Sequence, residues 1–338
     1  MAMTRRLRWA LLGGDSLLGR ELRDVVKERD LPVDLRVYGG VPASAVLTAE
    51  EDEAAVMEPL GEDSLDEVSA VFLAGTLDLS RQAMALAQRR GRKPVWVDVQ
   101  GDLEDLPESR LRAPLMEAEP RLAEPGSIES IAHPGAALLG QFFDLLWRAH
   151  PFRRSVVSAF EPVSTQGQKG IDELHQQTVS LLSLQSLPQG VFDAQVAFNM
   201  LPRYGSEAPH KLEASERRME RHLATMLAPR GIPLPSLRLL HAPVFHGYCF
   251  SVWVEFETRP PAETLERLFA AEGIDVRTAA TEPPSNRAVA GSSGITVGEI
   301  AADASDARAA WFFLAGDNFR TAAENAVMVA GLVKEGPR

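Results

Sequence analysis

The first third of the chain alternates short apolar runs with amphipathic segments, and this rhythm limits the possible folds more than any other feature of the sequence. Because strands separated by helices pair in parallel, the pattern predicts a doubly wound sheet, that is, an α/β Rossmann-type domain. The expected strands are LRWALLGG, DLRVYGG, VSAVFLAG and PVWVDV, and the expected helices are LLGRELRDVVKERD and LSRQAMALAQRRGRK.

Beyond about residue 150 the pattern changes to α+β, which predicts a second domain. Long strands, RRSVVSAFEPVST and YCFSVWVEFET, occur there with separate helices, GIDELHQQTVSLLSL and SERRMERHLATML. The stretches GSEAPHKLEAS and TEPPSNRAVAGSSG have the composition of loops. The closing segment DNFRTAAENAVMVAGLVKEG has apolar residues at helical spacing, so we expect a helix that packs on either domain.

Composition restricts the partners and the compartment. The 338 residues suffice for two domains, and a formal charge of −12 argues against nucleic acids or anionic membranes as partners. The single cysteine, Cys249, excludes an intrachain disulfide and fits a reducing compartment. The apolar run Trp9–Leu12 is too short for a secretion signal, and no stretch approaches the roughly 20 apolar residues of a membrane span. We therefore expect a cytoplasmic protein.

The stretch GGDSLLG, residues 13–19, follows an expected strand and opens an expected helix, as a dinucleotide-binding loop does. Its middle position is Ser16, which carries a side chain where backbone would approach a pyrophosphate. The end of the next strand offers Tyr38, two glycines and Pro42, with neither the acidic nor the basic residue that would meet a ribose or its 2′-phosphate. Nucleotide binding and a turn that only builds the fold both remain open.

Two further groups of polar residues have alternative interpretations. His241, His246 and Cys249 could suggest a metal site, but on an extended strand His246 and Cys249 face opposite sides, so we expect structural roles and no metal. Asp98 ends the strand PVWVDV, where α/β folds place ligand groups. A turn or helix cap explains Asp98 equally well.

The stretch IAHPGAALLG, residues 131–140, predicts the end of a strand and the start of a helix. Unpaired N–H groups at such a start can seat a nucleophile and hold an oxyanion. The seat contains Gly135, Ala136 and Ala137, none of which can attack a substrate. It is either an ordinary helix start or a catalytic site without its catalyst.

Taken together, eight segments of the chain resemble the aspartate-semialdehyde dehydrogenase family, and more closely its usg-like branch. The resemblance implies a Rossmann-type NAD(P)-binding domain over residues 4–134 and 318–338 and a semialdehyde-dehydrogenase-type dimerisation domain over residues 135–317. It also implies a homodimer. The segments are GGDSLLGREL, VFLAGTLDLSRQA, PVWVDV, IAHPGAALLG, STQGQKGIDELHQQT, AFNMLP, APVFHGYCFSVWVEFE and GDNFRTAAENAV.

The family's enzymes reductively dephosphorylate aspartyl phosphate with NADPH through a cysteine thioester, while a histidine handles protons. Their nucleophile turn aligns with residues 133–136, which puts Ala136 at the position of the thiol. The catalytic histidine falls on Tyr248. The resemblance therefore answers the question about the seat: it is similar to a catalytic site, and its thiol is absent.

Other family positions have also changed. The substrate-binding arginine falls on His241, the phosphate-binding arginine on Glu104, and the residues for the NADP 2′-phosphate near Pro42 and Ala43. The family's glutamine loop is shortened to STQGQKG. The resemblance implies cofactor contacts at Gly13, Asp15, Ser16, Leu17, Leu18, Gly75 and Asn318, and a substrate pocket with His241, Arg218 and Glu216.

These losses favour a catalytically silent, dimeric homologue that acts as a binding or regulatory protein. Pairing with an active paralogue is one way in which it could act. NADP or NAD should bind weakly or not at all. The alternative is an NAD(P)-dependent oxidoreductase that acts on a semialdehyde or another small carbonyl in amino-acid metabolism without a covalent intermediate. A third hypothesis is a metabolite sensor lined by Tyr248, His241 and Arg218, with Cys249 facing away from Tyr248 on its strand.

Overall fold

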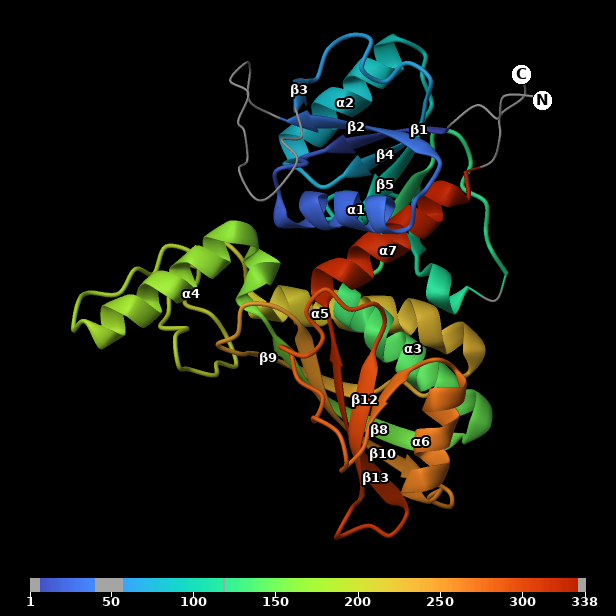
Figure 1. Ribbon diagram of the computed structural model, residues 1–338, viewed down its shortest axis with the longest axis vertical. Helices are drawn as coiled ribbons and strands as arrows, with labels where there is room; N and C mark the ends of the chain where they lie inside the picture. The colour runs from blue at the N-terminus through green and yellow to red at the C-terminus, as the bar shows by residue number, and fades with distance from the viewer. Residues whose placement is uncertain (1–6, 40–56, 118, 334–338) are drawn as a thin grey trace. The chain divides into compact units, whose positions relative to one another are not determined.

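The computed structural model describes residues 7–39, 57–117 and 119–333 (Figure 1). The chain divides into two compact units. The first comprises residues 1–132 and 322–338, and the second comprises residues 133–321. Helix α7 (Asn318–Gly331) carries the chain from the second unit back to the first.

The first unit contains a seven-stranded sheet in the order β3-β2-β1-β4-β5-β7-β6, in which every pair of neighbouring strands is parallel. The prediction of a doubly wound α/β domain is confirmed. The strands are β1 (Leu7–Leu12), β2 (Val33–Gly39), β3 (Glu58–Pro59), β4 (Val68–Leu73), β5 (Val95–Asp98), β6 (Ser109–Arg112) and β7 (Ile128–Ile131).

The helices of this unit form where apolar residues recur at helical spacing. In α1 (Leu17–Glu28), Leu18, Leu22 and Val25 are buried and share one face. The helix α2 (Leu77–Arg89) begins behind Thr76, whose hydroxyl accepts a hydrogen bond from the Leu79 N–H. The short 3-10 helix η1 (Pro114–Met116) lies between β6 and β7.

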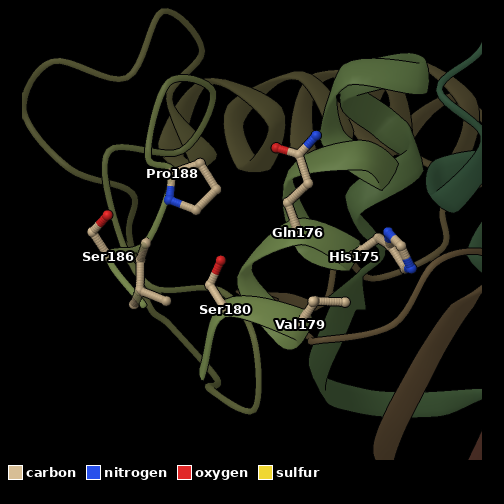
Figure 2. A pocket seen from close by; sticks show the side chains of 7 residues that line it. His175, Gln176, Val179, Ser180, Ser186 and Pro188 are labelled. Carbon is tan, nitrogen blue, oxygen red and sulfur yellow. The ribbon is translucent and has the colours of Figure 1, made fainter. Parts of the chain in front are cut away.

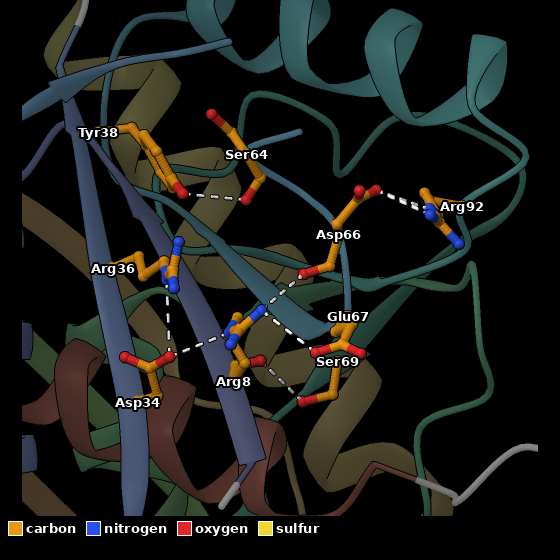
Figure 3. Close-up of polar contacts among 9 residues, drawn as sticks. All are labelled: Arg8, Asp34, Arg36, Tyr38, Ser64, Asp66, Glu67, Ser69 and Arg92. Atoms are coloured by element: carbon orange, nitrogen blue, oxygen red, sulfur yellow. Dashed lines mark hydrogen bonds and ion pairs between the residues drawn. The ribbon is translucent and has the colours of Figure 1, made fainter. Parts of the chain in front are cut away.

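Ion pairs gather at the amino-terminal ends of the first unit's strands (Figure 3). Arg8, at the start of β1, donates to Asp34 at 2.9 Å and to Glu67 at 3.4 Å. Parallel α/β sheets bind ligands at the opposite edge, outside the carboxyl ends of the strands. This network therefore belongs to the scaffold.

The second unit contains a mixed, six-stranded sheet in the order β11-β12-β13-β10-β8-β9. Its central strands β8, β10 and β13 pair antiparallel, whereas β9 joins β8 in parallel. The predicted α+β character is confirmed. The strands are β8 (Phe152–Glu161), β9 (Ser236–His241), β10 (Tyr248–Phe256), β11 (Asp275–Arg277), β12 (Thr296–Ala302) and β13 (Ala309–Gly316).

One of the loops expected from composition is partly helical. The stretch GSEAPHKLEAS ends inside α5, which begins at Leu212, because the buried residues Leu212, Ser215 and Met219 recur at helical spacing. The helices of the second unit are α3 (Pro134–Ala149), α4 (Gly167–Leu182), α5 (Leu212–Leu227) and α6 (Ala262–Ala271), with the 3-10 helices η2 (Val163–Gln166) and η3 (Ala228–Arg230).

The two faces of this sheet differ. On one face, Phe250 and its alternate neighbours along β10 are buried in the core. On the other face, Val156, Trp253 and Trp311 stand opposite one another on β8, β10 and β13, and Val156 and Trp311 are exposed. Both indoles donate to Asp303, at 3.0 Å from Trp253 and 2.7 Å from Trp311. We call this second surface the open sheet face.

Two searches of the described residues gave negative results. Neither unit has a helix long and apolar enough to cross a bilayer within residues 7–39, 57–117 and 119–333. In the same ranges, no group of three or more His, Cys, Asp or Glu side chains is arranged to hold a metal ion.

Candidate functional site

The glycines of the 13–19 loop are required by the packing of the backbone. Gly13 has a φ of +79°, and a Cβ there would lie 2.3 Å from the Cα of Gly75. A Cβ on Gly19 would lie 2.2 Å from the Gly13 carbonyl oxygen. The loop therefore needs glycine at these positions whether or not a nucleotide binds.

The other loop positions also have local roles. The Ser16 hydroxyl caps α1 by accepting from the Gly19 N–H at 2.9 Å, and it lies 2.8 Å from both the Gly13 and the Ala74 carbonyl oxygens. Asp15 is exposed, Leu17 is half-buried and Leu18 is buried. The predicted cofactor contacts of this loop stay a prediction.

The end of β2 offers no charged side chain to a ribose among its described residues. Tyr38 is buried, and its hydroxyl donates to the Ser64 carbonyl oxygen at 3.0 Å (Figure 3). Pro42 and Ala43, the expected 2′-phosphate positions, lie outside the described residues.

Asp98 is a turn cap. One carboxylate oxygen accepts from the Gly101 N–H at 2.9 Å, and the other accepts from the Leu103 N–H at 2.9 Å and the Ser130 hydroxyl at 3.1 Å. Of the two roles left open for Asp98, these contacts favour the structural one. Glu104, one residue beyond, is half-buried in the same turn.

The seat at the start of α3 is filled by protein. His133 precedes the helix, Pro134 begins it, and Ala136 is fully buried in the first turn. The His133 N–H donates to Nδ1 of His222 at 2.9 Å. A Cβ on Gly135 would lie 2.6 Å from Cε of Met219, which shows how tightly this turn is covered.

A buried polar cluster continues from this seat into the sheet. The Tyr248 hydroxyl donates to Glu161 at 2.9 Å and lies 3.3 Å from Nε2 of His133. The Tyr204 hydroxyl lies 3.5 Å from the other oxygen of Glu161 and 3.4 Å from Nδ1 of His241. We call these five residues, which are all buried, the Glu161 cluster.

Burial shifts the titration of the cluster. Loss of solvent raises the pKa of Glu161 to about 7, against the opposing effect of the Tyr248 hydrogen bond. Burial lowers the pKa of His241 to about 4, and burial together with the nearby Arg218 charge lowers the pKa of His133 well below its usual value. Near neutral pH the two histidines are therefore neutral, and Glu161 can hold or release a proton.

Comparisons with known proteins decide the family. The model of the semialdehyde dehydrogenase dimerisation domain matches residues 146–321, a little more than half of the chain. The chain belongs to the semialdehyde dehydrogenase family.

Individual relatives agree with the family. An aspartate-semialdehyde dehydrogenase of Rickettsia bellii is 25% identical, with 97% of this chain and 98% of that protein covered. A USG-1 protein homolog of Pseudomonas aeruginosa is 26% identical, with 98% of each covered. Both groups named from the sequence are thus among the relatives of this chain.

Solved structures share the fold. A probable aspartate-semialdehyde dehydrogenase from Pseudomonas aeruginosa has a TM-score of 0.82 at 25% identity, covering 97% of this chain and 98% of that one. An aspartate semialdehyde dehydrogenase from Candida albicans, solved with NADP, has a TM-score of 0.63 at 15% identity with the same coverage. Family members therefore include an NADP-bound protein.

Arg218 and Glu216 were both expected to line the substrate pocket of this semialdehyde dehydrogenase family member, but the structure gives them different roles. Glu216 accepts from the Leu239 N–H at 2.7 Å and from Arg238 at 3.1 Å, so it fastens α5 to β9. Arg218 lies close enough to the Glu161 cluster for its charge to affect both His133 and Tyr248. His241 thus belongs to the cluster and Arg218 lies near it, while Glu216 serves the scaffold.

Asn318 and Cys249 lie outside the cluster. The Asn318 side chain accepts from the Gly247 N–H at 3.0 Å and donates to the Ser164 hydroxyl at 3.2 Å, which positions the turn before β10. Cys249 is half-buried on the strand position next to the buried Tyr248. Burial raises the pKa of the Cys249 thiol to about 11, which disfavours the reactive thiolate.

The sequence did not predict the buried polar contacts of four residues: Glu161, Tyr204, His133 and His222. The available signal was the stretch VVSAFE, in which a carboxylate at Glu161 follows Val157 and Ala159 at alternate positions, on the side of the strand that these apolar residues bury. A charge in that place needs buried partners. Its partners come from β10 and from the loop before α5, which are distant in the sequence.

Proposed function

We propose that this chain is a semialdehyde dehydrogenase family protein that does not perform the family's thioester chemistry and acts as a dimeric binding or regulatory protein. One observation carries the proposal. Ala136 and Tyr248 occupy the positions that the resemblance assigns to the nucleophile and the base, and the Tyr248 hydroxyl is engaged with Glu161 inside a closed cluster.

Covalent catalysis needs an activated nucleophile within reach of a base. Ala136 has no such group, and its turn is packed by protein. Cys249 is a poor substitute because its pKa is raised and it follows Tyr248 on an extended strand, where successive side chains face opposite sides. Near the seat, Glu161 and the Tyr204 and Tyr248 hydroxyls bind within the cluster, while Nδ1 of His133 and Nε2 of His241 are buried without a hydrogen-bond partner among the described residues.

The assembly we propose is a homodimer formed through the second unit. The open sheet face supports this, because Val156 and Trp311 remain exposed there while the other face has its own helices. A two-fold interface would cover both copies with the same patch. An active paralogue of the same fold is the further partner that we propose.

The residues present fit a specific nucleotide contact poorly. At the end of β2 the Tyr38 hydroxyl is engaged with Ser64, and Ser16 caps its own helix. We therefore propose weak or absent NADP and NAD binding and derive no step through either cofactor. The single cysteine supports a cytoplasmic location.

The test is an assay of phosphate-dependent NADP reduction with aspartate semialdehyde. The wild type should show no turnover, since loss of a nucleophile costs on the order of a million-fold. Ala136→Cys should not restore it, and Ala136→Cys with Tyr248→His should remain poor while His241 and Glu104 occupy the anion-binding positions. Cys249→Ser is the control. Robust wild-type turnover that disappears in Cys249→Ser would refute the proposal.

A second candidate is an NAD(P)-dependent oxidoreductase without a covalent intermediate. Glu161 favours it, because a buried carboxyl with a pKa of about 7 beside a tyrosine hydroxyl can exchange a proton near neutral pH. This candidate requires tight cofactor binding. A thermal-stability titration with NADP and NAD separates the two, since only the oxidoreductase predicts saturable stabilisation.

A further inference from the structure

Helix α5 lies in a basic stretch of an acidic chain. Residues 203–238 contain seven lysines and arginines and four glutamates, whereas acidic residues outnumber lysines and arginines by 47 to 35 over the whole sequence. Some of these charges are paired within the protein. Arg230 pairs with Asp144 at 2.6 Å, and Arg238 pairs with Glu216 at 3.1 Å. Such pairs serve the scaffold, so the charges that stay unpaired are the informative ones.

Arg217 and Glu220 stay unpaired although each has a suitable neighbour. They lie three residues apart on α5, within reach of one another, and Glu213 precedes Arg217 by four residues, the order that favours an ion pair. Within the part of the chain that the structure describes, neither Arg217 nor Glu220 makes an ion pair or a hydrogen bond through its side chain. Both side chains are exposed to solvent.

Arg217 and Glu220 line the same hollow, which lies between α5 and the residues just before β9 and has a volume of about 570 Å³. We call it the α5 hollow. Small-molecule sites typically measure roughly 300–1,000 Å³. The other lining residues are Arg221, Leu223, Ala224, Leu234 and Pro235. The α5 hollow thus combines two guanidinium groups, one carboxylate and an apolar wall.

Another hollow of the second unit shows what distinguishes this one. It lies between α4 and residues 186–188, has a volume of about 510 Å³, and is lined by side chains that include His175, Gln176 and Ser180 (Figure 2). No carboxylate, lysine or arginine lines it. It therefore lacks the groups that pair with a ligand of two opposite charges, whereas the α5 hollow has both.

We propose that the α5 hollow binds a free α-amino acid with an apolar side chain. The ligand carboxylate accepts hydrogen bonds from Arg217 and Arg221, because the guanidinium fork matches a carboxylate. The ligand ammonium group donates to Glu220, and its side chain covers Leu223 and Leu234. An amino acid carries both charges on one carbon, so it fits between an arginine and a glutamate that do not pair with each other.

This site is separate from the Glu161 cluster. Successive residues of a helix are about 100° apart around its axis, so the adjacent Arg217 and Arg218 point in different directions. Arg218 lies near the cluster, whereas Arg217 lines the α5 hollow. The proposal goes beyond the proposed function, because it gives the protein a signal to bind whether or not the seat at Ala136 is silent.

The first test is isothermal titration calorimetry of the full chain with L-leucine. We expect one site per chain and a Kd between about 0.01 and 1 mM, since so small a ligand makes few contacts. L-leucinamide lacks the carboxylate and N-acetyl-L-leucine lacks the ammonium group, so each should bind at least tenfold more weakly. A derivative that binds as tightly as leucine would overturn the proposal, as would the absence of saturable leucine binding up to about 10 mM.

Charge variants locate the ligand. Arg217→Gln and Glu220→Gln should each raise the Kd for leucine at least tenfold, because each removes a charge-assisted hydrogen bond. Arg81→Gln is the matched control. Arg81 is an exposed arginine of helix α2 that also lacks a side-chain partner among the described residues. The control should change the Kd less than twofold.

A filled hollow gives a test that leaves every charge in place. Ala224→Phe puts a ring into the α5 hollow and should abolish leucine binding, whereas Ala262→Phe, at another half-buried helical alanine, should not. Thermal unfolding checks that both variants fold. Leucine affinity that stays unchanged in Arg217→Gln, in Glu220→Gln or in Ala224→Phe would place the ligand elsewhere and overturn the proposal.

Discussion

The 13–19 loop of the first unit and the start of α3 in the second unit are both similar to ligand-binding features of enzymes, but they keep different parts of that similarity. The loop keeps its glycines and its position between strand and helix. The start of α3 keeps the proline turn and the small residues, while Ala136 and the facing Tyr248 carry different chemistry.

The difference between the loop and the start of α3 indicates which residues are informative about function. Gly13 and Gly19 persist where a side chain would collide with backbone, so the fold alone demands them. Ala136 and Tyr248 are buried, but the backbone does not demand either residue type as it demands glycine at 13 and 19, so a change there is informative about chemistry. In this chain a glycine pattern is therefore weak evidence for a cofactor, and polar side chains near the seat are stronger evidence about activity.

The largest expected effect concerns the loop. Gly13→Ala should lower the free energy of unfolding by roughly 2 to 6 kcal/mol, because it combines an unfavourable φ with a collision against Gly75. Gly91→Ala is the control, since Gly91 also has a positive φ but no atom within 4 Å of the added Cβ. Urea denaturation measures both. Equal losses in the two variants would show that crowding at Gly13 is not what requires the glycine.

The next effect concerns the Glu161 cluster and pH. The folded-state pKa of Glu161 is raised, so the folded protein binds more protons than the unfolded chain between about pH 4.5 and 7. The unfolding free energy therefore falls as pH rises through this range.

The pKa of His241 is lowered, so between about pH 4 and 6.5 the unfolded chain binds more protons and stability rises with pH. The two residues oppose each other, and each contributes roughly 3 kcal/mol.

Glu161→Gln should remove the contribution of Glu161 to the pH dependence of stability and leave that of the buried histidines. The unfolding free energy of this variant should rise more steeply with pH between 4.5 and 6.5 than that of the wild type. His241→Gln should change the slope in the opposite direction. Urea denaturation at a series of pH values checks both, and parallel curves for all three proteins would show that the cluster does not titrate as its burial indicates.

The smallest effect concerns cofactor choice. The resemblance puts Pro42 and Ala43 near the positions of the 2′-phosphate contacts, and neither side chain can make the charge-assisted hydrogen bonds of roughly 1.5–3 kcal/mol each expected there. The dissociation constants for NADP and NAD should differ by less than about tenfold, or 1.4 kcal/mol. Isothermal titration calorimetry measures this difference. A sub-micromolar NADP affinity would contradict this prediction. The glycine pattern of the 13–19 loop would then be good evidence for a bound cofactor.

The sequence predicts the fold well because its periodic signals are local. The runs that became β1, β4 and β10 are apolar over their whole length or on alternate residues, so their type could be assigned without tertiary information. The short strand β6 (Ser109–Arg112) was missed because SRLR alternates only weakly. The start of α5 was missed because HKLEAS is polar, and Leu212 shows its burial only in three dimensions.

The site is less predictable because its parts are distant in sequence. The seat and Tyr248 were found through the family's motifs. Glu161, Tyr204 and His241 become a cluster only when β8, β9 and the loop before α5 meet, and no spacing in the sequence encodes that meeting. The shifted pKa of Glu161 depends on burial, which composition does not reveal.

On the proposed function, the network around Tyr248 also makes a return to the family's thioester chemistry costly in stability. Replacing Tyr248 by histidine would remove the hydroxyl that donates to the buried Glu161, and a buried carboxylate that loses a donor destabilises the fold. Ala136 is fully buried, so a larger side chain there would need room in a packed turn. Each first step back therefore lowers stability before any activity returns.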